Sequence, residues 1–306
     1  MREDPGVTEP SAPGIMLDVD GVPRGQGVLD ELMRLLELEQ LEVDLFRGTS
    51  PATSPVRVFG GQVAAQALVA AGRTIEPDRG VHSLHAYFIR GGDPGRPIVF
   101  RTERVRDGRS FSTRRVLAIQ GGEAIFALSA SFQLAQEGLE HSVPMSDGVP
   151  TPDELPSIGD RVVSGAGAAW IERVPRSLDI RFVDEPVWTE DRVATDDPLR
   201  AWMKADGRLP DDPLRHVCLL TYISDLTLLG SVVGRHDLTS TSVQMASLDH
   251  AMWFHQPFRA DEWLLYECWS PAASGGRGLA QGRFFTRDGR LVASTMQEGL
   301  VRLPRR

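Results

Sequence analysis

Three polar residues in the C-terminal third of the chain, Asp225, Ser247 and Gln297, are of types that could do chemistry. A carboxylate can act as a general base, and a hydroxyl and a primary amide can each donate and accept hydrogen bonds. Each residue also has an ordinary structural explanation. Asp225 would lie in the first turn of a helix, Ser247 would be a small hydroxyl in a strand, and Gln297 would face solvent from another strand. The spacing alone does not show that the three side chains meet.

Other catalytic motifs do not occur in the sequence. There is no Gly-x-Ser-x-Gly elbow and no His-Glu-x-x-His, and the segment from Gly165 to Trp170 departs from a dinucleotide fingerprint at its last position. The histidines show no metal-ligand spacing; they are residues 82, 85, 141, 216, 236, 250 and 255. We therefore expect neither a metal nor a cofactor.

Asp249 and His250 follow closely on Ser247, as if the three could form a catalytic triad. Neighbouring residues of a strand point to opposite faces, so Asp249 and His250 cannot both reach the side of Ser247. We interpret the pair as part of a strand rather than as a site.

Composition narrows the class of protein. The chain has 306 residues, 33 Lys+Arg against 42 Asp+Glu for a net charge of −9, and 41% hydrophobic residues, which is typical of one large or two ordinary globular domains. A net acidic chain is poorly suited to bind phosphate backbones, so we expect no nucleic-acid partner. Cys218 and Cys268 are too few for a disulfide framework. We predict no membrane span and, because the N-terminus lacks a secretory signal, a cytoplasmic location.

Helices and strands in the first half are indicated by hydrophobic periodicity. Helical spacing predicts a short amphipathic helix over 28–36, and alternation predicts a strand over 41–46. Small residues over 63–71 predict a helix that a sheet approaches closely. Strands separated by glycine turns are then expected over 82–90, 97–106, 110–120 and 123–134. This order predicts an α+β layer, with an antiparallel sheet wrapped on the helix.

The second half repeats this order of elements. A helical run over 219–233 precedes strands expected near 243–258, 263–269, 279–286 and 291–303. Three pairs of residues lie 164 positions apart: Ser83 and Ser247, Gln133 and Gln297, Gly61 and Asp225. We predict two copies of one unit. The expected parts are a mobile N-terminal extension (1–27), a first domain (28–135), a Pro-rich connection with one or two short strands (136–198) and a second, catalytic domain (199–306).

Four segments resemble the acyl-CoA thioesterase II family, with matches spread from about residue 28 to residue 303. They are Arg47-Gly48, Val58-Phe59-Gly60-Gly61-Gln62-Val63, the run from Ser247 to His255, and the run from Ala293 to Gly299. The resemblance implies a double hot dog, in which two fused copies of a long helix are each wrapped by an antiparallel sheet. The internal repeat predicts that architecture independently.

The resemblance also implies the activity and the roles of the candidates. In the family an Asp, a Thr or Ser, and a Gln of the second copy hold the nucleophilic water, and these fall on Asp225, Ser247 and Gln297. The implied reaction is hydrolysis of medium- to long-chain fatty acyl-CoA to fatty acid and CoA. Unpaired N–H groups at a helix start can bind the oxyanion, and we expect them at the start of the second helix, near Asp225.

Further expectations concern the number of sites and the assembly. Because Gly61 supplies no carboxylate where Asp225 stands, we predict one active site per chain, with the first copy as scaffold and wall. By resemblance we also expect a homodimer or a higher homo-oligomer. Two alternatives remain: a hydratase or dehydratase of the same fold, although no histidine lies near Asp225 in the sequence, and a non-catalytic acyl-CoA-binding protein.

Overall fold

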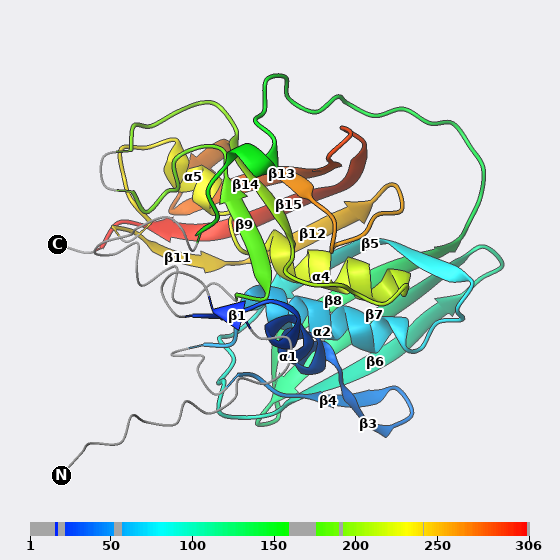
Figure 1. Cartoon of the computed structure of the whole chain (residues 1–306). Coiled ribbons are helices and arrows are strands. Elements are labelled where there is room, and N and C mark those ends of the chain that lie inside the picture. Colours follow the sequence, from blue (N-terminus) through cyan, green and yellow to red (C-terminus); the bar gives the residue numbers. More distant parts are fainter. Residues whose placement is uncertain are drawn as a thin grey trace, which may run out of the picture.

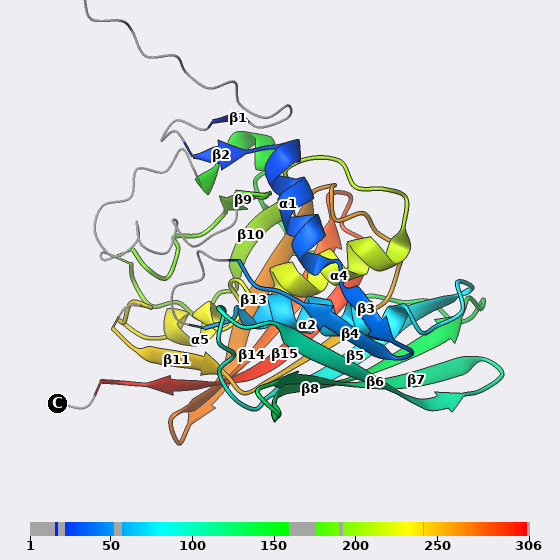
Figure 2. The same ribbon diagram turned by 90° about the horizontal axis from the view of Figure 1, so that it is seen from below.

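The computed structural model describes residues 16–17, 22–51, 57–158, 176–189, 192–240 and 242–304. Most of the predicted N-terminal extension and the segment from Gly165 to Trp170 lie outside these ranges. The described chain forms one long, curved sheet with helices against one side of it (Figures 1 and 2).

An antiparallel sheet of 13 strands runs through both halves of the described chain. Its first-half strands are β3 (Glu39–Glu42), β4 (Leu45–Gly48), β5 (Arg79–Phe88), β6 (Ile98–Asp107), β7 (Phe111–Gln120) and β8 (Glu123–Leu134). Its later strands are β9 (Leu178–Phe182), β10 (Leu199–Ala205), β11 (Gln244–Ser247), β12 (Asp249–Phe254), β13 (Leu264–Ser274), β14 (Arg277–Thr286) and β15 (Leu291–Arg302). The order is β3-β4-β6-β7-β8-β5-β12-β15-β14-β13-β10-β9, with β11 on β15. A separate two-stranded ribbon joins β1 (Met16–Leu17) to β2 (Pro23–Arg24).

The two halves are joined edge to edge by β5 and β12. Leu84 pairs with Met252 and His85 with Ala251, and both Leu84 and Met252 are fully buried. Backbone hydrogen bonds therefore continue from the first helix-on-sheet unit into the second without a free strand edge between them.

Helix α1 (Gln26–Leu36) buries the stripe that its periodicity predicts, and α2 (Gly60–Gly72) is buried along nearly its whole length between the sheet and α4 (Pro213–Ser224). α2 and α4 lie antiparallel: a Cβ on Gly61 would collide with the carbonyl oxygen of Tyr222, and one on Gly72 would collide with the side chain of Leu214. Glycine at these two places allows the backbones to approach closely. The N-terminus of α2 thereby lies against the C-terminus of α4.

Both predicted first-half helices and the four long first-half strands are confirmed, but three of the predicted elements differ in the structure, and β10 was not predicted. The predicted strand over 41–46 is a hairpin, β3–β4, which turns at Asp44 with a φ of 58°. The predicted helix over 219–233 ends at Ser224, and a short α5 (Gly230–Gly234) follows a turn. The apolar residues that continue the helical pattern, Leu226 and Leu229, instead pack against the core from that turn.

The third difference is the predicted strand over 243–258, which is two strands, β11 and β12, interrupted at Leu248. The N–H of Leu248 donates to the carbonyl of Glu298 at 2.9 Å. This interruption changes which side chains face the interior on either side of it.

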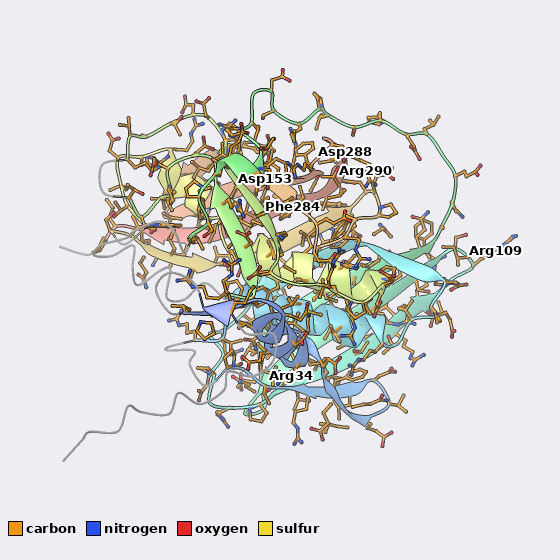
Figure 3. The ribbon with its side chains drawn as sticks, viewed as in Figure 1. Arg34, Arg109, Asp153, Phe284, Asp288 and Arg290 are labelled. Carbon is orange, nitrogen blue, oxygen red and sulfur yellow. The ribbon has the colours of Figure 1, made fainter. Side chains whose placement is uncertain are left out.

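Residues 150–153 pack on β10 and on the turn between β14 and β15. The indole N–H of Trp202 donates to the carbonyl of Pro150 at 2.9 Å, and Arg287 pairs with Asp153. Asp153 accordingly lies near Asp288 of the β14–β15 turn (Figure 3). These contacts hold residues 150–153 on the sheet that carries Gln297.

Candidate active site

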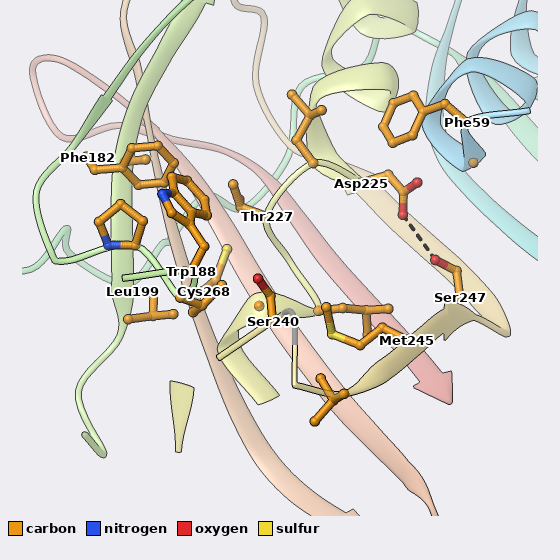
Figure 4. A pocket seen from close by; sticks show the side chains of 18 of the residues that line it. Phe59, Phe182, Trp188, Leu199, Asp225, Thr227, Ser240, Met245, Ser247 and Cys268 are labelled. Carbon is orange, nitrogen blue, oxygen red and sulfur yellow. Dashed lines mark hydrogen bonds between the residues drawn. The ribbon is translucent and has the colours of Figure 1, made fainter. Parts of the chain in front are cut away.

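Asp225, Ser247 and Gln297 come together in space. The Gln297 amide nitrogen Nε2 donates to Asp225 Oδ1 at 3.0 Å and to Ser247 Oγ at 2.6 Å. Ser247 Oγ in turn donates to Asp225 Oδ1 at 3.4 Å (Figure 4). A carboxylate just after α4, a hydroxyl from β11 and an amide from β15 thus form one hydrogen-bonded cluster.

The carboxylate lies at the meeting point of two helices. Asp225 is the residue that follows α4, and the N–H of Gly61 in the first turn of α2 donates a hydrogen bond to it. The partial positive charge at a helix N-terminus favours a neighbouring anion. The first half of the chain therefore supplies part of the environment of Asp225.

This geometry corrects the predicted place of Asp225. The helical periodicity predicts Asp225 at the start of the second helix, whereas it lies at the end of α4, because that helix begins earlier, at Pro213, behind the N-cap Asp212. The 164-residue match of Gly61 with Asp225 does not relate equivalent helix positions; the two residues are neighbours across the α2–α4 contact. The helix start that faces Asp225 is that of α2, so the expected N–H groups come from the first copy.

A cavity of about 790 Å³ opens beside the cluster. Asp225, Ser247 and Gly60 line it at one side, and Phe182, Trp188, Leu199 and Cys268 lie across it from Asp225 and Ser247 (Figure 4). The size and the mixture of apolar walls with a few convergent polar groups are those of a small-molecule site.

His250 belongs to the same neighbourhood, although the sequence pattern predicts only a place in a strand for it. Its Nδ1 lies 2.7 Å from Gln297 Oε1, and its Nε2 lies 2.9 Å from Ser224 Oγ. Strict alternation would point Ser247 and His250 to opposite faces, but the interruption at Leu248 brings both to Gln297. His250 bonds to Gln297 rather than forming a Ser-His-Asp relay with Ser247.

Burial raises the pKa of Asp225 above its ordinary value of 3.8, and it lowers the pKa of the neighbouring His250. The hydrogen bonds from Gln297, Gly61 and Ser247 act in the opposite direction on the carboxyl. A carboxyl group whose pKa lies above the usual range is a better proton acceptor than a free aspartate.

Comparison with known proteins identifies the family. The family model described as acyl-CoA thioesterase matches residues 179–300, and the one described as acyl-CoA thioesterase N-terminal domain matches residues 49–133. Acyl-coenzyme A thioesterase 8 of Mus musculus is 41% identical over 285 residues, which cover 88% of each chain. Acyl-CoA thioesterase 2 of Haemophilus influenzae is 36% identical over 90% of this chain and 98% of its own.

The chain belongs to the acyl-CoA thioesterase family.

Solved structures agree with this family and with the predicted architecture. An acyl-CoA thioesterase II from Mycobacterium marinum is 47% identical and superposes with a TM-score of 0.75 over 89% of this chain and 98% of that chain. A protein from Alicyclobacillus acidocaldarius described as having a hot dog fold superposes with a TM-score of 0.72 at 23% identity, over 90% of this chain and 99% of its own. The α+β double hot dog predicted from the sequence is confirmed.

The described residues also bear on membrane insertion and metal binding. Among the helices of the described residues, none combines the length and the apolar character needed to cross a membrane. The same described ranges contain no group of three or more His, Cys, Asp or Glu side chains arranged to hold a metal ion.

The pKa of Asp225 predicts how activity in this family member depends on pH. If the ionised carboxylate is the active form, kcat/KM falls as the pH drops through that pKa, and the midpoint of the acidic limb lies above 3.8 because burial raises the pKa. Gln297→Ala removes a hydrogen bond that stabilises the ionised form, so the limb moves to still higher pH. A pH series of kcat/KM measures both effects, and a limb at or below 3.8 in the wild type would contradict the assignment.

Proposed function

We propose that this chain hydrolyses the thioester of medium- to long-chain fatty acyl-CoA with a water molecule activated by Asp225. The observation that carries the proposal is the convergence of Asp225, Ser247 and Gln297 in one hydrogen-bonded cluster, of which Asp225 and Ser247 line a largely apolar cavity. Family membership supplies the reaction class, and the cluster supplies a base, Asp225, whose carboxylate is held beside the cavity by hydrogen bonds from Ser247 and Gln297.

In the proposed mechanism, Asp225 accepts a proton from water while the water oxygen bonds to the thioester carbonyl carbon. The carbonyl π electrons move to oxygen and give a tetrahedral oxyanion. As the C=O bond reforms, the C–S bond breaks, and the CoA thiolate takes the proton from Asp225. The products are a fatty acid and CoA thiol, so protons and charge balance. General base catalysis of this kind contributes roughly 10²–10⁴ in rate.

The oxyanion is proposed to bind at the start of α2. The first N–H groups of a helix have no partner within the helix, and Gly60 lines the cavity beside Asp225. Donors placed where negative charge develops stabilise the transition state more than the ground state. One active site per chain then uses both copies, with the base from the second and the helix N-terminus from the first.

The size of the cavity supports a medium- to long-chain substrate. We expect Trp188, at the far side from Asp225, to limit the length of the acyl chain (Figure 4). Trp188→Ala should raise kcat/KM for longer chains relative to shorter ones, by up to about fourfold per newly buried methylene, since each buried CH₂ contributes about 0.8 kcal/mol. Acyl-CoA substrates of increasing length measure this ratio.

The matched control for that prediction is Trp269→Ala. Trp269 stacks against Arg283 and is not among the described residues that line the cavity. An unchanged chain-length profile is expected for this control. A Trp188→Ala profile identical to that of the wild type would remove Trp188 from the acyl site.

The direct test of the function is release of free CoA thiol from palmitoyl-CoA and shorter acyl-CoAs by the purified protein. Turnover is expected. Binding without thiol release would indicate a non-catalytic acyl-CoA-binding protein. Hydration of an enoyl-CoA without hydrolysis would indicate the hydratase alternative, which the structure disfavours because His250, although close to Asp225, does not line the cavity.

We also propose a cytoplasmic location and a homo-oligomer. Both cysteines are free and buried, as in a chain that does not depend on disulfides. Tyr87 and Ile89, at and just beyond the end of β5, are 65% and 46% exposed, and such large apolar side chains favour contact with a second copy.

The division into residues 28–135 and 199–306 around a Pro-rich connection remains our proposal, and limited proteolysis tests it.

A further inference from the structure

A buried pair, His250 and Ser224, lies behind Gln297. Their exposures are 2% and 0%, and that of Gln297 is 1%. His250 Nδ1 contacts Gln297 Oε1 at 2.7 Å, and His250 Nε2 contacts Ser224 Oγ at 2.9 Å. Neither His250 nor Ser224 is among the described residues that line the cavity. The pair can therefore act on the reaction only through Gln297 and Asp225.

The hydrogen-bond partners fix which way the Gln297 amide points. An ionised carboxylate only accepts hydrogen bonds, so the amide NH₂ must face Asp225 and Oε1 must face His250. Since Oε1 is an acceptor, His250 Nδ1 carries the proton in that contact. A flipped amide would set its NH₂ against the Nδ1–H and its oxygen against the carboxylate, so both contacts would be repulsive.

The other ring nitrogen is held by the end of α4. With Nδ1 protonated and burial lowering the pKa of His250, the ring is neutral and Nε2 accepts. The single hydroxyl proton of Ser224 is then donated to Nε2 rather than to the carbonyl of Thr221, which lies at a similar distance. The backbone carbonyl of Ser224 accepts from Tyr266 at 3.0 Å, which fixes the residue that presents this hydroxyl.

We propose that His250 is a positioning residue, whose Nδ1–H fixes the Gln297 amide with both N–H groups directed at Asp225 and Ser247. The proposal rests on the proposed function, because it requires Asp225 to be the base. Ser224 sets the tautomer of the imidazole, and the imidazole sets the orientation of the amide. Without that donor the amide can rotate, and the geometry of the water site is lost.

The first test compares two replacements of His250. His250→Leu removes the donor and is expected to lower kcat by about 10- to 100-fold, the size of effect that small misplacements produce, while KM changes little because His250 does not line the cavity. His250→Asn keeps an N–H donor near the Nδ1 position and should recover most of kcat. His250→Gln, whose amide reaches the Nε2 position instead, should be impaired like His250→Leu and replaces it if the leucine variant does not fold.

The control for nonspecific damage is His216→Leu. His216 is a buried histidine of α4, 3% exposed, whose Nδ1 accepts from the N–H of Ala260. This variant should lose thermal stability while kcat stays near the wild-type value. If the variants at His250 and at His216 both lost kcat in proportion to their loss of Tm, the proposal would be overturned.

A double-mutant cycle tests whether His250 acts through Gln297. When His250→Leu is added to Gln297→Ala, kcat should fall by less than about threefold relative to Gln297→Ala alone, because the amide that His250 orients is already absent. Independent, multiplicative losses would overturn the proposal, as would a His250→Leu kcat within about threefold of wild type. Failure of the proposed function is distinguishable: it would appear as full turnover by Asp225→Asn, whatever the His250 variants do.

Discussion

Asp225→Asn is expected to reduce kcat/KM for palmitoyl-CoA by roughly 10²–10⁴, because it removes the proposed base while keeping the shape of the side chain. The Asn carbonyl oxygen can still accept from the Gln297 amide and from Ser247, so the rest of the cluster stays in place. Thiol release under saturating and subsaturating substrate separates kcat from KM. Activity within about threefold of wild type would reject Asp225 as the base.

The same variant should be at least as stable as the wild type. The pKa of Asp225 is raised in the folded state, so the folded protein binds that proton more tightly than the unfolded chain does. The free energy of unfolding therefore decreases as the pH rises from the pKa of Asp225 in the unfolded chain to its pKa in the folded protein. At neutral pH the whole of this decrease is present. A neutral Asn removes the penalty, and a thermal melt should show an equal or higher Tm.

Controls for one site per chain come from the first copy. Ser83 and Gln133 are the sequence counterparts of Ser247 and Gln297, and Gln133 bonds only to Gln136 among the contacts described for its side chain. Ser83→Ala and Gln133→Ala should leave turnover close to wild type. A loss of orders of magnitude in either variant would contradict a single site per chain.

The sequence predicted the repeated units because hydrophobic period and glycine turns are local signals. Gly121 and Gly122 adopt φ values of 58° and 84°, as the hairpin between β7 and β8 requires. Helix 60–72 was found from its small residues, which local composition shows directly. The place where α4 ends was missed, because the apolar residues after Ser224 keep the helical spacing while they pack as a turn.

The candidate site was predicted only in part, for a related reason. Residue type and place in the repeat single out Asp225, Ser247 and Gln297, the family resemblance gives them their roles, and the structure brings them into contact. His250 was set aside because alternation along a continuous strand directs it away from Ser247, and the interruption at Leu248 has no signature in a single sequence. The sequence does not predict that Gly60 lies beside Asp225, because the antiparallel contact of α2 with α4 joins segments that are far apart in the chain.

Gly60→Ala is expected to lower kcat by about 10²-fold, although it lies in the other copy from the carboxylate. A Cβ at this position would lie 2.5 Å from Asp225 Oδ2 and 2.9 Å from Phe88 Cε1, so the carboxylate or the start of α2 must shift. Displacements of about 1 Å within a reacting cluster cost on the order of 10² in rate. Alanine favours a helix over glycine by about 1 kcal/mol, so the fold is expected to survive.

Gly80→Ala is the matched control, because nothing lies within 4 Å of a Cβ added at Gly80 in β5 of the same copy. Turnover by this variant should equal that of the wild type. If Gly60→Ala also retained kcat within about threefold, the N-terminus of α2 would not take part in the reaction. If instead Gly60→Ala loses kcat with its Tm preserved, the active site depends on the contact between the two copies, and neither copy could supply it alone.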